Sequence, residues 1–253
     1  MRTGIGLGIG AIAAMMVAAA AVWSLEQGWL RLLDPPLAEY PVQGLDVSHH
    51  QGPIDWEAVA DTGRFRFVWI KATEGGDFVD PRFREHWRGA REAGLVVGAY
   101  HFFTLCRPGR DQAENLLREL AAVGGARLDP SLPVAVDLEL GGNCARRPST
   151  AEVLAEVHAF LATVARATGR KPVVYTTYEF HRAYLVGAWP TGHPLWIRSV
   201  FTRPAAEVDG EPWVIWQYLP RGRVPGIEGV VDQNAFAGDA DAFATFTRAP
   251  PGP

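Results

Sequence analysis

The chain has 253 residues, of which 48% are hydrophobic and 21% charged, and its formal net charge is −4. This composition is typical of a globular protein with one full hydrophobic core, and the length suits a single barrel of about 200–250 residues. The chain is not basic enough for a nucleic-acid-binding protein, so nucleic acid is not an expected partner.

The first 25 residues are expected to direct export. Residues 4–23 carry no charge and follow Arg2. About 20 apolar residues can span a bilayer, whereas the apolar region of a signal peptide usually has about 7–15. This length favours an uncleaved signal anchor, while the small residues Ala18–Ala20 leave a cleaved signal peptide open and a buried core helix is a third interpretation. Because the positive charge precedes the apolar segment, an anchor and a signal peptide would both place the remainder in the periplasm, on the extracytoplasmic face of the membrane, or outside the cell.

We divide the rest of the chain into three parts. Residues 26–43, which contain Asp34-Pro-Pro36, are interpreted as a tether. Residues 44–248 form the predicted folded domain, and residues 249–253 a tail.

The predicted domain contains eight short runs rich in Val, Ile and aromatic residues. Their length and composition favour strands, and several are almost continuously apolar, as expected of parallel strands that are covered on both faces. The runs are residues 44–48, 67–73, 95–103, 132–139, 172–177, 194–199, 213–218 and 229–232.

Helical patterns separate the first five or six strands. Helices are predicted at residues 55–61, 80–93, 107–123 and 149–168, with a short one at 239–246. The fourth begins with the capping box Ser149-Thr-Ala-Glu152 and stops at Gly169. Alternating strands and helices predict a parallel sheet, and the last three strands have little room for helices between them. The fold class is therefore α/β, an eight-stranded TIM-like barrel with a degenerate last quarter.

Two carboxylates, Asp137 and Glu139, close the fourth strand on one face. Residues i and i+2 of a strand point the same way, which places them about 7 Å apart at Cα. Burying both raises at least one pKa and suits acid/base cleavage of a glycosidic bond; a solvated strand end is the alternative. Asp46 lies late in the first strand and Asp232 ends the eighth, which adjoins the first in a closed barrel. Catalytic groups of such barrels lie at the C-terminal ends of the strands, so we expect one site with four carboxylates.

Cys106 and Cys144 each follow a predicted strand. Two cysteines are too few for a zinc cage without His ligands at suitable spacing, so no metal is expected. In an oxidising compartment they can pair in a disulfide, with two independent thiols as the alternative.

Six motifs stand in order along the chain. They are Gly44-Leu-Asp-Val-Ser-His-His-Gln51 with Ile54-Asp-Trp56, Trp69-Ile-Lys-Ala-Thr-Glu-Gly75, Gly98-Ala-Tyr-His-Phe102, Val136-Asp-Leu-Glu139, Trp216-Gln-Tyr218 and Val231-Asp-Gln-Asn234. The set resembles glycoside hydrolase family 25, the lysozyme-type muramidases. The resemblance implies a flattened (β/α)5(β)3 barrel. It also implies cleavage of the β-1,4 bond between N-acetylmuramic acid and N-acetylglucosamine in peptidoglycan, without a metal or cofactor.

The resemblance also implies a role for each carboxylate. Glu139 resembles the general acid that protonates the leaving oxygen. Asp137 resembles the partner that orients the substrate's N-acetyl group or positions water, and Asp46 and Asp232 resemble supporting carboxylates. Retention and inversion both stay open, because spacing in the sequence does not fix the separation of the carboxyl groups.

Aromatic side chains at strand ends offer flat apolar faces to sugar rings, with core packing as the alternative for each. The candidates for substrate binding are Tyr100, Phe102, Tyr175, Trp196, Trp216 and Tyr218.

Other polar residues near the strand ends are read as supporting groups. Arg198 stands where the family usually has a smaller residue, and it is expected to narrow a subsite or to pair with an acid. Lys71 is read as an ion-pair partner inside the barrel and Glu74 as a structural or subsite residue. His49, His50 and His101 lack metal-ligand spacing and are read as polar neighbours of the site.

Two other functions compete with a muramidase. One is a catalytically idle peptidoglycan-binding module, which has no need for Glu139. The other is a glycosidase that acts on chitin-like N-acetylglucosamine polymers. The expected partners are peptidoglycan glycan strands and, through the N-terminal segment, a membrane, with the enzyme acting as a monomer.

Overall fold

The computed structural model describes residues 15–17, 19–21, 23–24, 33–124, 131–205, 207–208 and 210–248. The described pieces between residues 15 and 24 are helical, and the rest of the predicted export segment lies outside the described residues, as does the predicted tail at 249–253. Within the described part of the chain, we find no helix with the length and apolarity needed to cross a bilayer.

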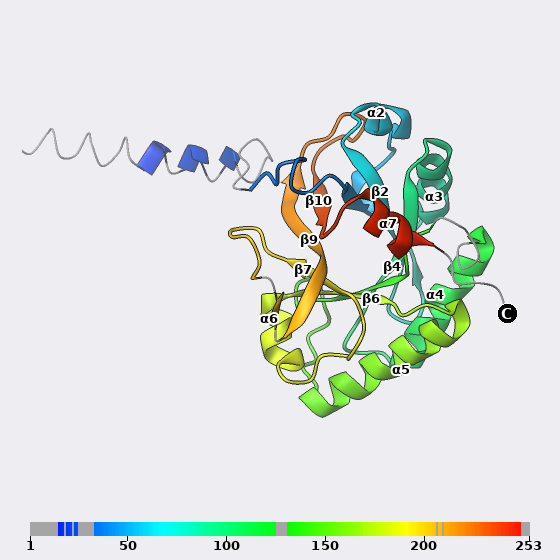
Figure 1. Ribbon diagram of the computed structural model, residues 1–253. Helices are drawn as coiled ribbons and strands as arrows, with labels where there is room; N and C mark the ends of the chain where they lie inside the picture. The colour runs from blue at the N-terminus through cyan, green and yellow to red at the C-terminus, as the bar shows by residue number, and fades with distance from the viewer. Residues whose placement is uncertain are drawn as a thin grey trace, which may run out of the picture.

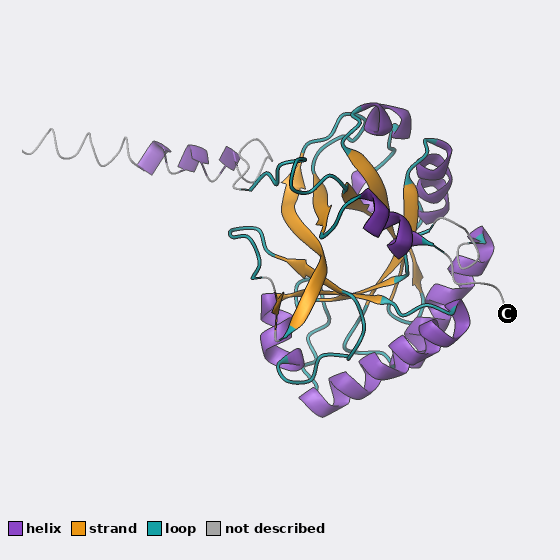
Figure 2. Ribbon diagram, viewed as in Figure 1, coloured by secondary structure: helices purple, strands orange, loops and turns teal. Residues whose placement is uncertain are grey.

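Eight strands of the described chain close into a barrel (Figures 1 and 2). Seven of them are parallel to their barrel neighbours among themselves, and the eighth, β10, is antiparallel to both β9 and β1. The barrel strands are β1 (Gln43–Val47), β2 (Phe65–Glu74), β4 (Val96–Phe102), β5 (Ala135–Leu138), β6 (Val173–Thr177), β7 (Leu195–Arg198), β9 (Glu211–Gly222) and β10 (Val231–Phe236). This architecture confirms the predicted α/β barrel.

A helical segment follows each of the first five barrel strands, and none lies between the last three in the residues described. In chain order the segments are η1 (His49–Gln51) with α2 (Trp56–Asp61), α3 (Phe83–Glu92), α4 (Gly109–Val123), α5 (Thr150–Thr168), and α6 (Tyr178–Phe180) with the π-helical turn η3 (His181–Leu185). A last helix, α7 (Ala240–Thr247), follows β10. The arrangement is the expected (β/α)5(β)3 barrel.

Two short strands were not predicted. β3 (Phe78–Val79) pairs with the end of β2, and β8 (Glu207–Val208) pairs with the start of β9. Two residues are too few to produce a recognisable alternation of polar and apolar side chains. Both strands lengthen loops beside the barrel and do not enter its ring.

Side chains that alternate along the strands build two separate cores. The outward-facing residues pack under the helices, as Leu45, Val136 and Ile197 do. The inward-facing residues fill the barrel, where the rings of Trp69 and Trp196 stack with centroids 4.6 Å apart. Because this interior is filled with side chains, the barrel is not an open channel, and space for a ligand is left only at its ends.

The outer face of β9 and β10 is covered by the chain that precedes β1, and no helix of residues 33–248 that the structure describes lies over it. Tyr40 is 5% exposed and packs against Trp216 and Tyr218 in a third apolar cluster. Gln43 Nε2 donates to the carbonyl oxygen of Pro35 at 2.8 Å. The described residues 33–42, which we call the strap, therefore pack against the barrel.

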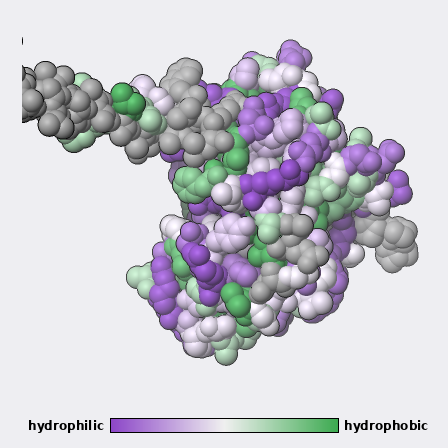
Figure 3. Space-filling model, turned by 60° about the vertical axis from the view of Figure 1, so that its left-hand side comes forward, coloured by the Kyte–Doolittle hydropathy of each residue, from purple (hydrophilic) through white to green (hydrophobic). Residues whose placement is uncertain are grey.

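The surface of the barrel is mixed in polarity. On the face shown in Figure 3, hydrophilic and hydrophobic residues are interspersed. The large hydrophobic side chains of residues 33–248 that are exposed include Phe78 and Val79 on β3 and Phe201 in the loop after β7.

Candidate active site

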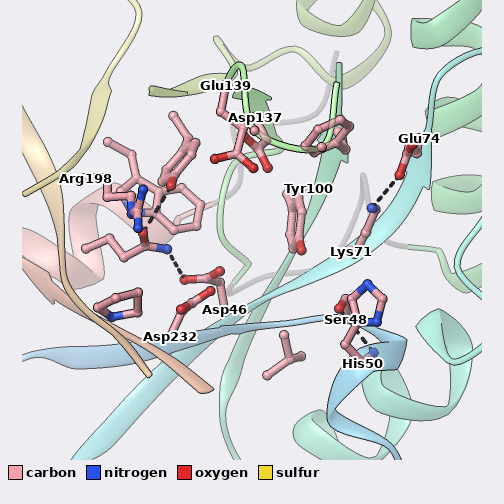
Figure 4. Close-up of a pocket in the computed structure, with 18 of the residues that line it drawn as sticks. Asp46, Ser48, His50, Lys71, Glu74, Tyr100, Asp137, Glu139, Arg198 and Asp232 are labelled. Atoms are coloured by element: carbon pink, nitrogen blue, oxygen red, sulfur yellow. Dashed lines mark hydrogen bonds and ion pairs between the residues drawn. The ribbon is translucent and has the colours of Figure 1, made fainter. Parts of the chain in front are cut away.

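A cavity of about 530 Å³ opens at the C-terminal ends of the parallel strands (Figure 4). Its walls carry all four carboxylates that the sequence singled out, Asp46, Asp137, Glu139 and Asp232. The four side chains therefore line one cavity, where the sequence placed one candidate site. Among the described residues, no group of three or more His, Cys, Asp or Glu side chains is arranged as a metal site.

Asp137 and Glu139 enter the cavity from β5 and from the residue just beyond it (Figure 4). Val136 and Leu138, which alternate with them, point the other way into the outer core. Burial raises the pKa of Asp137 well above its ordinary value, and the neighbouring Glu139 adds to this effect. Burial also raises the pKa of Glu139, while the positive charge of Arg198 opposes the rise.

One oxygen of Asp137 is left without a partner. Its Oδ1 atom is buried, and no hydrogen bond from any described residue reaches it. A buried acceptor of this kind lowers stability unless a ligand or water donates to it. The atom is therefore available for a donor group on a bound substrate.

Asp46 and Asp232 form a second acidic pair on the opposite wall. They are Cα partners in the antiparallel register of β1 and β10, and their carboxyl groups share a hydrogen bond. Burial raises the pKa of both, and the charge of Asp46 raises that of Asp232 further. Two buried carboxyls this close hold one proton between them at neutral pH.

The position of Asp232 on its strand corrects the sequence prediction. Asp232 was expected to end the last strand, but it is the second residue of β10, Val231–Phe236. Because β10 runs antiparallel to its neighbours, its first residues lie at the same rim as the last residues of the other strands. The antiparallel direction of β10 therefore brings Asp232 to the cavity although it lies near the start of its strand.

Two amide side chains decide which member of this pair is charged. Asp46 Oδ2 accepts hydrogen bonds from Asn234 Nδ2 at 2.7 Å and from Gln217 Nε2 at 3.0 Å. The opposite end of each amide is also fixed, because Trp196 Nε1 donates to Asn234 Oδ1 at 2.9 Å and the Tyr175 hydroxyl donates to Gln217 Oε1 at 3.1 Å. An indole N–H can only donate, so the Asn234 amide cannot be turned round. Asp46 is therefore the ionised acceptor, and the shared proton belongs to Asp232.

The sequence reasoning missed Gln217 and Asn234, although both lie inside quoted motifs. A signal was present for Asn234, since it stands two residues after Asp232 and so faces the same side of the strand. Gln217 separates two aromatic residues that were taken for the functional ones.

Four of the six aromatic candidates line the cavity, and two do not. Tyr100, Phe102, Tyr175 and Trp196 line the cavity. Trp216 and Tyr218 do not, because Gln217 takes the inward position of β9 and its two neighbours point outward onto the strap. Their polar atoms are occupied there: Trp216 Nε1 donates to the carbonyl oxygen of Ser199 at 2.7 Å, and the Tyr218 hydroxyl donates to Gln43 Oε1 at 3.0 Å.

Lys71 is an ion-pair partner inside the barrel, as expected. Its Nζ atom lies 2.7 Å from Glu74 Oε2 and 4.9 Å from the centre of the Phe102 ring. Residues three apart on a regular strand face opposite sides, but β2 shifts register between Lys71 and Thr73. This bulge turns Glu74 toward the cavity beside Lys71.

Arg198 reaches the cavity from the end of β7 (Figure 4). Its positive charge opposes the rise that burial causes in the pKa of Glu139, Asp46 and Asp232. Among the hydrogen bonds and ion pairs of the described residues, however, none involves its guanidinium group. Arg198 is thus close to the acids without forming an ion pair with one.

The three histidines have polar supporting positions. His50 lines the cavity, and His49 Nδ1 lies 2.8 Å from Asp80 Oδ2. His101 is buried between Thr73 and Gln112, and burial lowers its pKa to about 3, so its ring is neutral.

A disulfide joins Cys106, after β4, to Cys144, after β5, and it confirms the pairing that the sequence left open. The adjacent Asn143 binds the same two loops. Its Nδ2 atom donates to the carbonyl oxygens of Phe103 and Glu139, and its Oδ1 atom accepts from the backbone N–H of Leu105 at 2.9 Å. Disulfide and amide together hold the backbone at Glu139 in place.

Comparison with known proteins gives a consistent result. The family model described as "Glycosyl hydrolases family 25" matches residues 45–227. The chain is 36% identical over 213 residues to "Uncharacterized protein YegX" of Escherichia coli (strain K12), covering 83% of this chain and 74% of that protein. It is 35% identical over 207 residues to "Lysozyme M1" of Streptomyces globisporus, covering 79% and 69%. The solved structure of a family 25 glycosyl hydrolase from Bacillus anthracis superposes with a TM-score of 0.76 at 33% identity, covering 84% of this chain and 96% of that one.

Proposed function

The chain belongs to glycosyl hydrolase family 25 and is a glycoside hydrolase, and from this premise we propose that it is a muramidase. Its substrate would be peptidoglycan, cleaved at the β-1,4 bond between N-acetylmuramic acid and N-acetylglucosamine. The relative named "Lysozyme M1" supports this substrate class.

The observation that carries the proposal is the pair Asp137 and Glu139, which faces one cavity with buried carboxyl groups of raised pKa. A general acid must hold its proton near the working pH, and burial in an apolar wall provides this for a carboxyl group. Glu139 is the less buried of the two, and the positive charge of Arg198 opposes the rise in its pKa. Both properties suit a group that must release and regain a proton.

In the proposed reaction, Glu139 donates its proton to the glycosidic oxygen as the bond to C1 of muramic acid breaks. The carbonyl oxygen of the substrate's own N-acetyl group attacks C1, and the unpartnered Oδ1 of Asp137 accepts the acetamido N–H. Water then adds to C1 and gives its proton to the Glu139 carboxylate, which restores the acid. This course retains the anomeric configuration. Attack by a water molecule held by Asp137 would instead invert it.

Digestion of purified sacculi in heavy-oxygen water tests this function. We expect products with a labelled reducing end on muramic acid, initially as the β-anomer, and no such products from the Glu139→Gln variant. Labelled N-acetylglucosamine ends from chitin oligomers, without cleavage of sacculi, would instead identify a chitin-type glycosidase. Binding to sacculi without any cleavage would identify a glycan-binding module.

We further propose that residues 1–25 export the barrel, either as an uncleaved anchor or as a cleaved signal peptide, and that residues 249–253 form a tail. The Cys106–Cys144 disulfide supports export, because such bonds persist in oxidising compartments. The mass of the chain recovered from fractionated cells distinguishes an anchor from a cleaved signal. Recovery in the cytosol with reduced cysteines would contradict export.

A further inference from the structure

Two cations line the cavity, and among the described residues only Lys71 has an ion-pair partner. Lys71 is paired with Glu74 at 2.7 Å and lies over the Phe102 ring. Arg198 lies at the same cavity with no hydrogen bond or ion pair from any described residue. Its guanidinium therefore has unused N–H donors that face the space where substrate binds.

The acids near Arg198 are engaged elsewhere. Asp46 Oδ2 is saturated by Asn234 and Gln217, and the proton of Asp232 is shared with Asp46. The charge of Arg198 also acts on the pKa of Glu139, which transfers the proton in the proposed reaction. The negative charge of these acids stabilises the cation, but the N–H groups of Arg198 donate no hydrogen bond to them.

The backbone holds Arg198 in a fixed position. Arg198 pairs with Gln217 in the register of β7 and β9, and the N–H of the next residue, Ser199, donates to the carbonyl oxygen of Gln217 at 3.1 Å. Two residues earlier, Trp196 is anchored by its stack on Trp69 and by its bond to Asn234. The planar guanidinium at the end of this strand can bind a planar anion with two parallel hydrogen bonds.

The proposed substrate contains one planar anion that is attached directly to a sugar ring. The lactyl group of muramic acid ends in a carboxylate when no stem peptide is attached, and in an uncharged amide when one is. N-acetylglucosamine has no lactyl group. Arg198 and Glu139 line the same cavity, and both side chains point into it (Figure 4). We therefore place the lactyl group of a sugar whose glycosidic oxygen meets Glu139 within reach of Arg198.

We propose that Arg198 binds the free lactyl carboxylate of muramic acid, so that this enzyme prefers glycan strands from which the stem peptides have been removed. The proposal rests on the proposed muramidase function. It places the enzyme after an amidase-type reaction, which releases the peptide and exposes the carboxylate.

The test uses three soluble substrates of equal glycan length: peptide-free oligomers, the same oligomers with the lactyl carboxyl converted to a methylamide, and oligomers that carry stem peptides. We expect the wild-type chain to cleave the peptide-free oligomers with a kcat/KM at least about tenfold above the other two. Arg198→Gln should remove this preference by lowering kcat/KM for the peptide-free oligomers about tenfold, while the methylamide changes less than about twofold. Arg198→Lys should retain part of the preference. Arg110→Gln, which removes an exposed positive charge on α4, is the matched control and should leave the preference intact.

Several outcomes would overturn the proposal. One is a wild-type chain that does not distinguish the carboxylate from the methylamide. Another is an equal loss on all substrates in Arg198→Gln together with a shifted pH profile, which would mean that Arg198 acts only on the charge of the acids. If Arg198→Gln does not fold, inhibition of the wild-type chain by N-acetylmuramic acid and by its methylamide decides instead, and equal inhibition would contradict the proposal. If no glycan is cleaved at all, the muramidase function fails; binding of the two oligomers to the wild-type chain then still tests Arg198 separately.

Discussion

Asp46 on β1 and Asp232 on β10 face each other across an antiparallel strand pair, and the hydrogen bond between their carboxyl groups runs from Asp232 to Asp46. Asp46 receives two amide N–H donors, from Asn234 at 2.7 Å and Gln217 at 3.0 Å, so the negative charge is stabilised there. Asp232 keeps the proton and donates a hydrogen bond to Asp46. This wall of the cavity therefore carries one negative charge, although it contains two carboxyl groups.

Replacing Glu139 with Gln should abolish turnover without unfolding the protein. The amide keeps the shape of the side chain but has no proton to give to the leaving oxygen, and general acids contribute about 10²–10⁴-fold to rates. We expect release of products from sacculi to fall by at least this factor, and the free energy of unfolding to change by less than about 1 kcal/mol. Glu179→Gln is the control, because Glu179 is an exposed carboxylate whose charge reaches Glu139 but which does not line the cavity. Turnover retained in Glu139→Gln would disprove its role.

Replacing Asn234 with Asp should lower stability in a pH-dependent way. The retained Oδ1 can still accept from Trp196, but the new oxygen, which replaces Nδ2, cannot donate to Asp46, so a second buried carboxyl faces Asp46. We expect a loss of about 1–3 kcal/mol at pH 7, measured by denaturant unfolding, and a smaller loss at pH 5, where an added proton can bridge the oxygens. Asn115→Asp is the control, since Asn115 is also buried and donates only to backbone carbonyls away from the cavity. A loss of unfolding free energy in Asn234→Asp that does not vary with pH would argue against a negative charge on Asp46.

Replacing Asp137 with Asn should make the protein more stable at neutral pH. Burial and Glu139 raise the pKa of Asp137 in the folded state, so the folded state binds more protons than the unfolded state above about pH 4. Stability must then fall as the pH rises from the unfolded pKa toward the folded one. The variant lacks this loss, and we expect its Tm at pH 7.5 to exceed that of the wild-type chain by about 2–4 °C per kcal/mol gained, with a smaller difference at pH 4.5.

The comparison must be made between variant and wild type, because His101 changes stability in the opposite direction. Its folded pKa of about 3 lies below its unfolded value, so its contribution is complete above the unfolded pKa of 6.5 and is lost as the pH falls toward 3. This loss is common to both proteins and cancels in the difference. An equal Tm difference at both pH values would show that Asp137 does not have a raised pKa.

Breaking the disulfide should weaken both stability and catalysis. The bond joins residues 38 apart in sequence, for which the chain-entropy model gives about 4 kcal/mol. We expect the Cys106→Ser/Cys144→Ser variant to melt at a lower temperature, and reductant to lower the Tm of the wild-type chain but not of the variant. Because Asn143 ties the same loops to the carbonyl oxygen of Glu139, turnover should fall as well at temperatures where the variant stays folded. Unchanged turnover would show that the bond acts on stability alone.

The order of strands and helices was predictable because apolar residues repeat with a different period in strands and in helices. Helix caps also depend only on residues close in sequence. Ser149 accepts from the N–H of Glu152 at the start of α5, as the sequence indicated. The direction of β10 was not predicted. Residues 223–230 between β9 and β10 are too few for the crossover that parallel strands require, so the antiparallel direction could have been inferred from loop length.

The carboxylates of the site were predictable from their place at strand ends, but the residues that set their charge were not. Which face of β9 turns inward depends on its register with β10, and this register shifts twice along the pair. Such irregularities leave no mark in the sequence, so Gln217 and Trp216 could not be told apart as inward and outward residues. Arg198 was noticed as unusual, but its lack of an ion pair depends on where the neighbouring strands place their acids.

The strap has a consequence for how the enzyme is held. Since Tyr40 and Gln43 fasten residues 33–42 to the outer face of β9 and β10, any force or attachment acting upstream of Leu33 is transmitted directly to the barrel wall. The same Gln43 binds Tyr218, whose strand carries Gln217 into the cavity. A displacement of the strap would therefore reach Gln217 and, through it, the carboxylate of Asp46.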